Sequence, residues 1–381
     1  MVFLLAPDSF KESMTALQVC AAMEAGIKKI LPDAICQSVP LADGGEGTLP
    51  ALVAATGGKI FKHAVSDPLG NIITGEYGIL GDGQTGMVEL ASASGLHLVP
   101  LSHRNPLLTS TYGTGELIKE ALSRGIKKLI IGIGGSATND GGAGIAQALG
   151  IKFRDEHGQE IPKGGGSLNK IATIDYSGLI SLPDDLSVEV ACDVTNPLTG
   201  EFGASHVYGP QKGGTPYMIK VLDENLEHYA KKIKEFSGKD ISGIAGAGAA
   251  GGGGAGLMAF LNGKLVSGID LVIKHTGLEE KIKNADFIFT GEGSIDSQTA
   301  NGKTISGVVS LAKKYQKPVV AFAGKVADTE ALYQLGLTAV FGILPAIMPL
   351  EEALKTGEKN LESATEAAVR LILVARLPQN I

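Results

Sequence analysis

The sequence predicts an α/β protein of two domains, in which a parallel α/β domain built from both ends of the chain carries an inserted mixed α/β domain. Its 381 residues exceed the size of one ordinary hydrophobic core. Strand-like and helix-like runs alternate over residues 1–66 plus 285–381, which is typical of a parallel sheet with crossover helices. Residues 67–284 are less regular and begin with alternating apolar positions, which indicates antiparallel hairpins and hence a second domain.

The terminal segments give the elements of the parallel domain in order. Residues 2–6 form a short apolar run, and residues 13–31 follow with apolar side chains at helical spacing, so we expect a buried strand and an amphipathic helix. The further elements that we expect are strand 35–41, helix 48–56, strand 287–289, helix 304–315, strand 319–322, helix 329–335, strand 339–344 and helix 361–375.

The middle of the chain predicts a different arrangement. Residues 62–90 form hairpins, strands follow at 129–133 and 188–192, and a long charged helix covers 216–236. Residues 246–256 are rich in glycine but are not polar enough for a free linker. We interpret this segment as a tight loop and helix start that lies against a ligand or a neighbouring backbone.

Composition excludes several classes of function. The net charge is −7, aromatic residues make up 5% of the chain and Trp is absent, which argues against nucleic acid as a partner. No apolar stretch is long enough to span a membrane, so we expect no membrane partner. The three cysteines lack metal-ligand spacing, and we expect reduced thiols and a cytoplasmic location. The sequence does not decide whether the chain forms a homo-oligomer.

Three segments rich in glycine and acidic residues carry the strongest functional signal. They cover residues 42–48, 134–142 and 290–296, and each follows a strand-like run, where ligands bind in open α/β sheets. Glycine lets backbone N–H groups approach an anion closely. A carboxylate there would repel a phosphate unless it held a divalent cation or accepted a proton. Together the segments predict phosphoryl transfer with Mg²⁺.

Two alternative functions compete with this interpretation. Residues 132–137 fit the dinucleotide-binding pattern G-x-G-x-x-G/A after a strand, and Asp155 follows at about the required spacing, so an NAD-dependent hydroxyacid oxidoreductase is the alternative enzyme. A non-enzymatic regulator or receptor that binds sugar acids is the other alternative. Neither a DNA-binding element nor a basic patch supports the regulator.

Six collinear motifs resemble the bacterial glycerate kinase family over essentially the whole chain. They cover residues 6–11, 42–48, 134–142, 192–200, 209–213 and 290–293. The resemblance implies ATP-dependent phosphorylation of D-glycerate with Mg²⁺ in the breakdown of glyoxylate, glucarate or related acids. It also implies two α/β domains, one of them discontinuous and flavodoxin-like. The family branch that it favours makes 2-phosphoglycerate, although 3-phosphoglycerate is the alternative product.

The candidate site residues follow mainly from their chemistry. Lys11, Lys212 and Lys303 can hold phosphates or a carboxylate, and either Asp8 or Asp43 can accept the proton of the substrate hydroxyl. The candidate catalytic residues are Asp8, Lys11, Asp43 and Lys212. The candidate nucleotide-binding residues are Ser9, Gly44, Gly45, Gly134, Gly135, Ser136, Asp140 and Lys303. The candidate Mg²⁺ ligands are Asp193, Glu292 and Asp296.

Overall fold

The computed structural model describes residues 1–42, 44–45, 47–297, 299 and 304–375. It is an α/β protein, as predicted, and the chain divides into two compact units. The first unit comprises Met1–Asp43, Ala54–Thr56 and Ile269–Ile381, and the second comprises Gly44–Val53 and Gly57–Gly268. These bounds differ from the predicted ones. Residues 59–66 pair within the sheet of the second unit, and residues 278–284 pack on a helix of the first.

The first unit contains a parallel sheet of five strands. In chain order these are β1 (Val2–Leu5), β2 (Ile35–Ser38), β11 (Phe287–Ile295), β12 (Val319–Val326) and β13 (Ala339–Gly342). Their order across the sheet is β13-β12-β11-β1-β2, and every pair is parallel. Counted along the chain, this is the order 2-1-3-4-5 of flavodoxin-like sheets. The strand order therefore reverses between β1 and β11.

Helices cover both faces of this sheet. They are α1 (Ala16–Ile30), α9 (Gly268–Thr276), α10 (Leu278–Asn284), α11 (Thr304–Lys314), α12 (Glu330–Leu335), α13 (Leu350–Lys355) and α14 (Gly357–Ala375). Phe3, Leu4 and Leu5 are fully buried, as expected for a strand covered on both faces. Right-handed crossovers that lead in opposite directions from the reversal place α1 on one face and α11 on the other.

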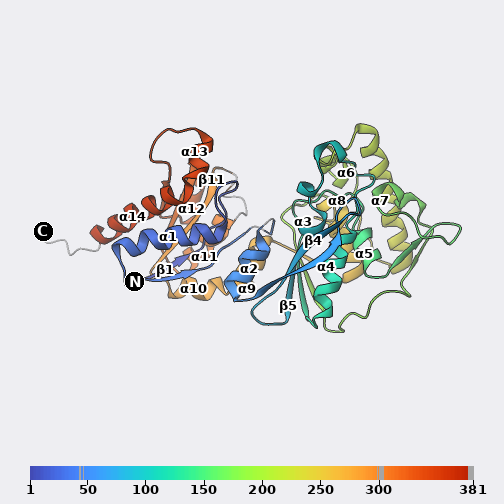
Figure 1. Ribbon diagram of the computed structural model, residues 1–381, viewed down its shortest axis with the longest axis horizontal. Helices are drawn as coiled ribbons and strands as arrows, with labels where there is room; N and C mark the ends of the chain where they lie inside the picture. The colour runs from blue at the N-terminus through green and yellow to red at the C-terminus, as the bar shows by residue number, and fades with distance from the viewer. Residues whose placement is uncertain (43, 46, 298, 300–303, 376–381) are drawn as a thin grey trace. The chain divides into compact units, whose positions relative to one another are not determined.

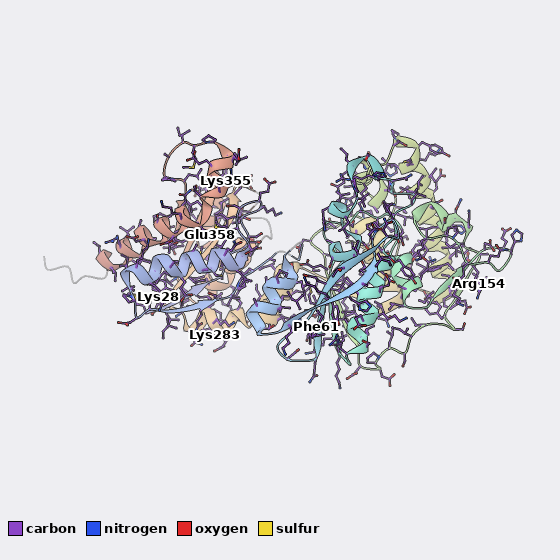
Figure 2. All side chains as sticks on the ribbon, viewed as in Figure 1. Lys28, Phe61, Arg154, Lys283, Lys355 and Glu358 are labelled. Atoms are coloured by element: carbon purple, nitrogen blue, oxygen red, sulfur yellow. The ribbon has the colours of Figure 1, made fainter. Side chains whose placement is uncertain are left out.

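Helices α1 and α14 lie side by side and join the two ends of the chain (Figure 1). They approach closely at Gly26, where an added Cβ would lie 2.5 Å from the carbonyl oxygen of Glu362 and 2.8 Å from Cβ of Thr365. At the start of α14, Glu358 (labelled in Figure 2) accepts a 2.9 Å hydrogen bond from Gln18 on α1. The absence of a side chain at residue 26 thus sets the distance between the two helices.

The second unit is built on a mixed sheet of six strands. They are β3 (Lys59–Ser66), β4 (Ile72–Ile79), β5 (Thr85–Glu89), β6 (Lys128–Gly132), β9 (Ser187–Ala191) and β10 (Lys264–Val266). Their order is β10-β9-β6-β5-β4-β3. The predicted hairpins are confirmed, because β3, β4 and β5 pair antiparallel, whereas β5, β6, β9 and β10 are parallel. A separate hairpin joins β7 (Lys152–Arg154) and β8 (Thr173–Asp175).

Two hydrophobic clusters hold the second unit together. Its helices are α2 (Thr48–Thr56), α3 (Ala91–Ser94), α4 (Tyr112–Ser123), α5 (Ala143–Ala148), α6 (Ala204–Tyr208), α7 (Pro216–Ser237) and α8 (Ala249–Leu261). The last three residues of α2, Ala54–Thr56, are counted with the first unit. One cluster lies between the sheet, α4 and α8, and the other joins α5, α7 and α8 around Phe153, Tyr229 and Phe260. Within the described ranges of both units, no helix is long and apolar enough to cross a membrane.

We predict that Gly26→Ala destabilises the first unit. A glycine-to-alanine change in a helix interior ordinarily stabilises by about 1 kcal/mol, but here the new Cβ must push α1 and α14 apart. Overpacking of this kind costs about 1–3 kcal/mol, so the melting temperature should fall by about 2–8 °C. Ala25→Gly, at the exposed neighbouring position, measures helix propensity alone. A melting temperature that rises in Gly26→Ala would contradict the packing described above.

Candidate functional site

The first unit contains a cavity of about 520 Å³ where the strand order reverses. Its walls include the segment that follows β1, from Asp8 to Ser13, and the end of β11, from Glu292 to Ser294. In doubly wound sheets the loops on the two sides of such a reversal lead to opposite faces, and this opens a crevice at the carboxyl ends of the strands. The candidate residues Asp8, Ser9, Lys11, Glu292 and Asp296 all line this cavity.

Hydrogen bonds from Ser9 and Thr304 orient the carboxylate of Asp8. Its Oδ1 accepts from the backbone N–H of Ser9 at 2.6 Å and from the Ser9 hydroxyl at 3.2 Å, and its Oδ2 accepts from the hydroxyl of Thr304 at 2.7 Å. The backbone N–H of Asp8 also donates to the carbonyl of Gly291, which extends the pairing of β1 with β11. Asp8 is therefore a half-buried carboxylate of fixed orientation at the cavity wall.

The third acidic segment is a strand, not the loop that we predicted from its sequence. Residues 290–295 continue β11 and pair with β12 in register from Thr290↔Ala321 to Ile295↔Val326. The glycine-rich sequence of this segment does not indicate a strand, because the hydrogen-bond partners of the strand come from β12. The pairing places Glu292 on a rigid element at the cavity, and Asp296 directly follows it.

Glu292 and Asp296 are joined through Thr299. The Thr299 hydroxyl donates to Oε1 of Glu292 at 2.7 Å and accepts from the backbone N–H of Asp296 at 3.2 Å. The backbone N–H of Thr299 donates to the carbonyl of Asp296 at 3.0 Å. Thr299 is fully buried, and sequence reasoning did not select it because its partners become neighbours only when the turn has formed.

The cavity also carries two exposed lysines. Lys11 lies in a turn next to Glu12, whose φ of 65° is in the left-handed region. Lys325 lines the same cavity from the end of β12 and was not among the predicted residues. Its signal in the sequence is a lysine that directly follows glycine at the carboxyl end of an apolar strand. Two predicted residues, Asp43 and Lys303, lie outside the described residues.

In the second unit, two of the glycine-rich segments pack directly on each other. A Cβ on Gly132 would lie 3.0 Å from the carbonyl oxygen of Gly44, and one on Gly134 would lie 3.0 Å from Cα of Gly45. Gly134 and Gly135 are exposed, and Gly135 has a φ of 71°. The structure thus brings together four of the residues predicted to bind the nucleotide.

Asp140 is fully buried, so its carboxylate organises the loop from within. It accepts hydrogen bonds from the backbone N–H of Thr111 at 2.7 Å, the Thr111 hydroxyl at 2.9 Å and the backbone N–H groups of Gly142 and Gly144 at 3.1 and 3.2 Å. Burial raises the pKa of the Asp140 carboxyl, and these hydrogen bonds oppose the shift. Because Asp140 is not exposed, the structure does not support the predicted contact of its side chain with a nucleotide.

Lys212 is also buried, whereas its polar sequence context predicted an accessible side chain. It ends the 3₁₀ helix η4 (Pro210–Lys212), and its Nζ donates to the Ser136 hydroxyl at 2.9 Å and to the carbonyl of Thr138 at 2.7 Å. Burial lowers the pKa of Lys212 to about 7, and the nearby charge of Asp140 opposes this shift. Lys212 thus stabilises the 134–142 loop from the buried side of the loop.

The predicted metal ligands belong to different units. Glu292 and Asp296 share the cavity of the first unit, whereas Asp193 belongs to the second unit, where its Oδ1 accepts from the backbone N–H of Gly268 at 3.0 Å. Across the described part of the chain, no group of three His, Cys, Asp or Glu side chains is arranged to hold a metal ion. A cation here would need further oxygens from water or from a bound phosphate.

The dinucleotide-binding alternative is not supported by the geometry after β6. In that motif the glycine turn leads directly into a helix whose N-terminus faces the pyrophosphate. Here α5 begins only at Ala143, and residues 136–142 form a buried loop between Gly135 and that helix. The segment 246–256 fits the motif no better, because Ala250, Gly251 and Gly252 all have left-handed φ values within α8.

Comparisons with known proteins agree on one family. The model of the glycerate kinase family matches residues 3–373. The chain is 51% identical over 362 residues to the glycerate kinase of Halalkalibacterium halodurans, with 95% of each chain covered. It is also 51% identical to the glycerate 2-kinase of Escherichia coli, with 95% of each covered, and 48% identical to the glycerate kinase of Bacillus subtilis, with 99% of each covered.

A solved structure agrees with these relatives. A crystal structure from Salmonella typhimurium LT2, which carries the provisional name glycerate kinase 2, superposes with a TM-score of 0.92 at 47% identity. The match covers 99% of this chain and 100% of that chain.

We predict that Lys212 makes stability depend on pH. The unfolded chain keeps this proton up to the ordinary pKa of 10.5, whereas the folded chain releases it at about 7. Between these values the unfolded state binds more protons, so the free energy of unfolding rises with pH, by at most about 1.4 kcal/mol per pH unit.

Urea unfolding of the native protein and of Lys212→Met, at about pH 7.5 and about pH 9.5, measures this effect. The stability of the native protein relative to the variant should increase by about 2–3 kcal/mol over that interval. Lys128→Met, at an exposed lysine, corrects for the general loss of a positive charge. Parallel pH dependences in the native protein and Lys212→Met would exclude a proton release from Lys212 on folding.

Proposed function

The chain belongs to the glycerate kinase family and is a kinase, and we propose that it transfers the γ-phosphoryl group of ATP to the C2 hydroxyl of D-glycerate with Mg²⁺. One observation carries the proposal: carboxylates and lysines converge on the cavity at the reversal of strand order. The printed name of the Escherichia coli relative supports C2 over C3. The three free cysteines support a cytoplasmic location. From membership of the family, we infer a role in the breakdown of glyoxylate, glucarate or related acids.

Lys11 and Lys325 supply the positive charge that the phosphates need. Phosphoryl transfer demands in-line positioning and neutralised phosphate charge more than covalent chemistry from the protein. Both lysines line the cavity and are exposed, so their ammonium groups can move onto a ligand without breaking the core. This arrangement supports Lys11 as a catalytic residue and adds Lys325 to the proposed site.

The acidic residues of the cavity fit a Mg²⁺ ion that is shared with the nucleotide. Mg²⁺ is commonly bound through one or two carboxylates together with substrate phosphates and water, not by an all-protein cage. Glu292 and Asp296 provide such a pair on one wall, and their shared partner Thr299 fixes one oxygen of Glu292. A bound Mg²⁺ ion would neutralise charge on the phosphates. We keep Asp193 as a further candidate in the second unit.

Asp8 is the proposed acceptor of the substrate proton. Its two oxygens are oriented by Ser9 and Thr304, and it shares the cavity with Lys11. A carboxylate held in this way can accept the hydroxyl proton as the oxygen attacks phosphorus. Asp43 remains the alternative acceptor of the proton, and only its residue type supports this role.

The second unit provides a backbone surface for anions. The exposed glycines at 134 and 135 carry no side chain that would block access to their N–H groups, and Gly44 and Gly45 pack beside them. Ser136, Asp140 and Lys212 lie beneath this surface and hold its shape. We therefore assign the four glycines to ligand binding and the buried residues to positioning.

We predict that Lys11→Ala and Asp8→Asn lose most of their activity while they remain folded. Removing a charge aimed at the phosphoryl group costs about 2–4 kcal/mol, or roughly a factor of 30–10³ in kcat/KM, and removing a general base costs roughly a factor of 10²–10⁴. Steady-state kinetics measures the activity, and circular dichroism checks that each variant is folded. Lys128→Ala is the matched control, because Lys128 is also exposed but begins strand β6. If all three variants had similar kcat/KM values, the proposed active site would be misplaced.

We also predict that the product is 2-phosphoglycerate. Purified protein with ATP, Mg²⁺ and D-glycerate is coupled to enolase, which consumes only the 2-phosphate. Phosphoenolpyruvate should form without phosphoglycerate mutase, and EDTA should stop its formation because the phosphate charge would no longer be neutralised.

Each control separates one part of the proposal. If phosphoenolpyruvate appeared only after mutase was added, the transfer would be to C3. ADP release that survives EDTA would remove Mg²⁺ from the proposal but leave the kinase reaction. No ADP release with any of these mixtures would remove the reaction itself.

A further inference from the structure

The cavity of the first unit has an apolar wall that the proposed chemistry does not use. Ile343 and Leu344 follow the end of β13, and α13 adds Leu350, Ala353 and Leu354. Helix α13 is labelled in Figure 1, and Lys355 marks its last residue in Figure 2. The wall is entirely aliphatic, whereas Asp8, Lys11 and Glu292 make the rest of the cavity polar.

Part of this wall is exposed to water. The exposed fraction is 72% for Leu350 and 41% for Leu344. Single exposed leucines are common on protein surfaces and need no explanation. Here, however, they lie together along a cavity, and apolar walls with a few polar groups are typical of small-molecule sites. An apolar part of a ligand that covered them would gain from the removal of this surface from water.

The size and position of the wall indicate which part of a ligand covers it. A cavity of about 520 Å³ is far larger than a three-carbon acid requires. The polar groups gather at β1 and β11, and the apolar wall begins at β13, which lies two strand spacings from β11, or about 10 Å. An extended nucleoside triphosphate places a flat, largely apolar base at about this separation from its terminal phosphates.

We propose that the nucleobase of the phosphate donor packs on the aliphatic wall formed by Ile343, Leu344, Leu350, Ala353 and Leu354. The inference rests on the proposed function, since it takes the polar end of the same cavity as the phosphate site. The ribose then crosses the end of β12 at Gly324 and Lys325, which line the cavity between the two ends. Base contact with the wall is by area and shape, because its side chains carry no hydrogen-bonding atom.

A fluorescence titration tests the contact directly, because the chain contains no Trp. In Leu350→Trp the only indole of the protein stands on the proposed wall. Titration with ADP should change its emission with saturation, and titration with inorganic tripolyphosphate, which has no base, should leave it unchanged. Leu371→Trp on α14 is the matched control, at a leucine that is 63% exposed and does not line the cavity. Its emission should respond to neither compound.

Kinetics gives a second, independent measurement. Leu350→Ser should raise the KM for ATP roughly tenfold and leave the KM for D-glycerate unchanged, since it removes apolar contact area only. Leu371→Ser should change neither constant. The inference is overturned if the Leu350→Trp emission ignores ADP or responds equally to tripolyphosphate, or if Leu350→Ser leaves the KM for ATP unchanged. Absence of turnover in the native protein would instead overturn the proposed reaction, while the ADP titration would still test the wall.

Discussion

The reversal of strand order beside β1 determines where the first unit can bind a ligand. A right-handed crossover from β1 leads to α1 on one face of the sheet, and the crossover from β11 leads to α11 on the other. The chain segments that leave these two strands must therefore separate at their carboxyl ends. Asp8 and Glu292 stand at this separation, so a rule of chain handedness brings together groups that are 284 residues apart in sequence.

In the second unit, the glycine loop of residues 134–142 is ordered in another way. Two ionisable residues, Asp140 and Lys212, are buried beneath an exposed glycine backbone, and nearly every polar contact that they make goes to the loop or to the segment beside it. Burying such groups costs free energy unless they are hydrogen-bonded. The hydrogen bonds of the two buried residues offset this cost and fix one conformation of a loop whose exposed residues are glycines. The charged groups of Asp140 and Lys212 thus shape the loop from the interior of the unit.

Much of the fold could be predicted from local patterns, but the burial of polar residues could not. Apolar spacing located α1 and β1 within a few residues, and the ends of apolar runs pointed to Asp8 and Glu292. The extension of β11 was missed because its hydrogen bonds come from β12, which no local pattern reveals. The polar residues around Lys212 predict an accessible side chain, but it is buried against Ser136 and Thr138, which are distant in sequence. The polarity of neighbouring residues in the sequence does not reveal whether a side chain is buried, because burial depends on partners that are distant in the sequence.

The discontinuous first unit has a consequence for how the chain is made. Its β1 must pair with β11, and Thr290 donates to the carbonyl of Ala6 across a sequence separation of 284 residues. During synthesis, β1 and α1 leave the ribosome together with β2 but long before β11 and α14 exist, while the whole second unit can fold in between. Contacts of such high sequence separation form slowly. The core around Phe3, Leu5 and Met23 therefore cannot be completed until the last third of the chain, which supplies Phe289, Phe322 and Leu361, is translated.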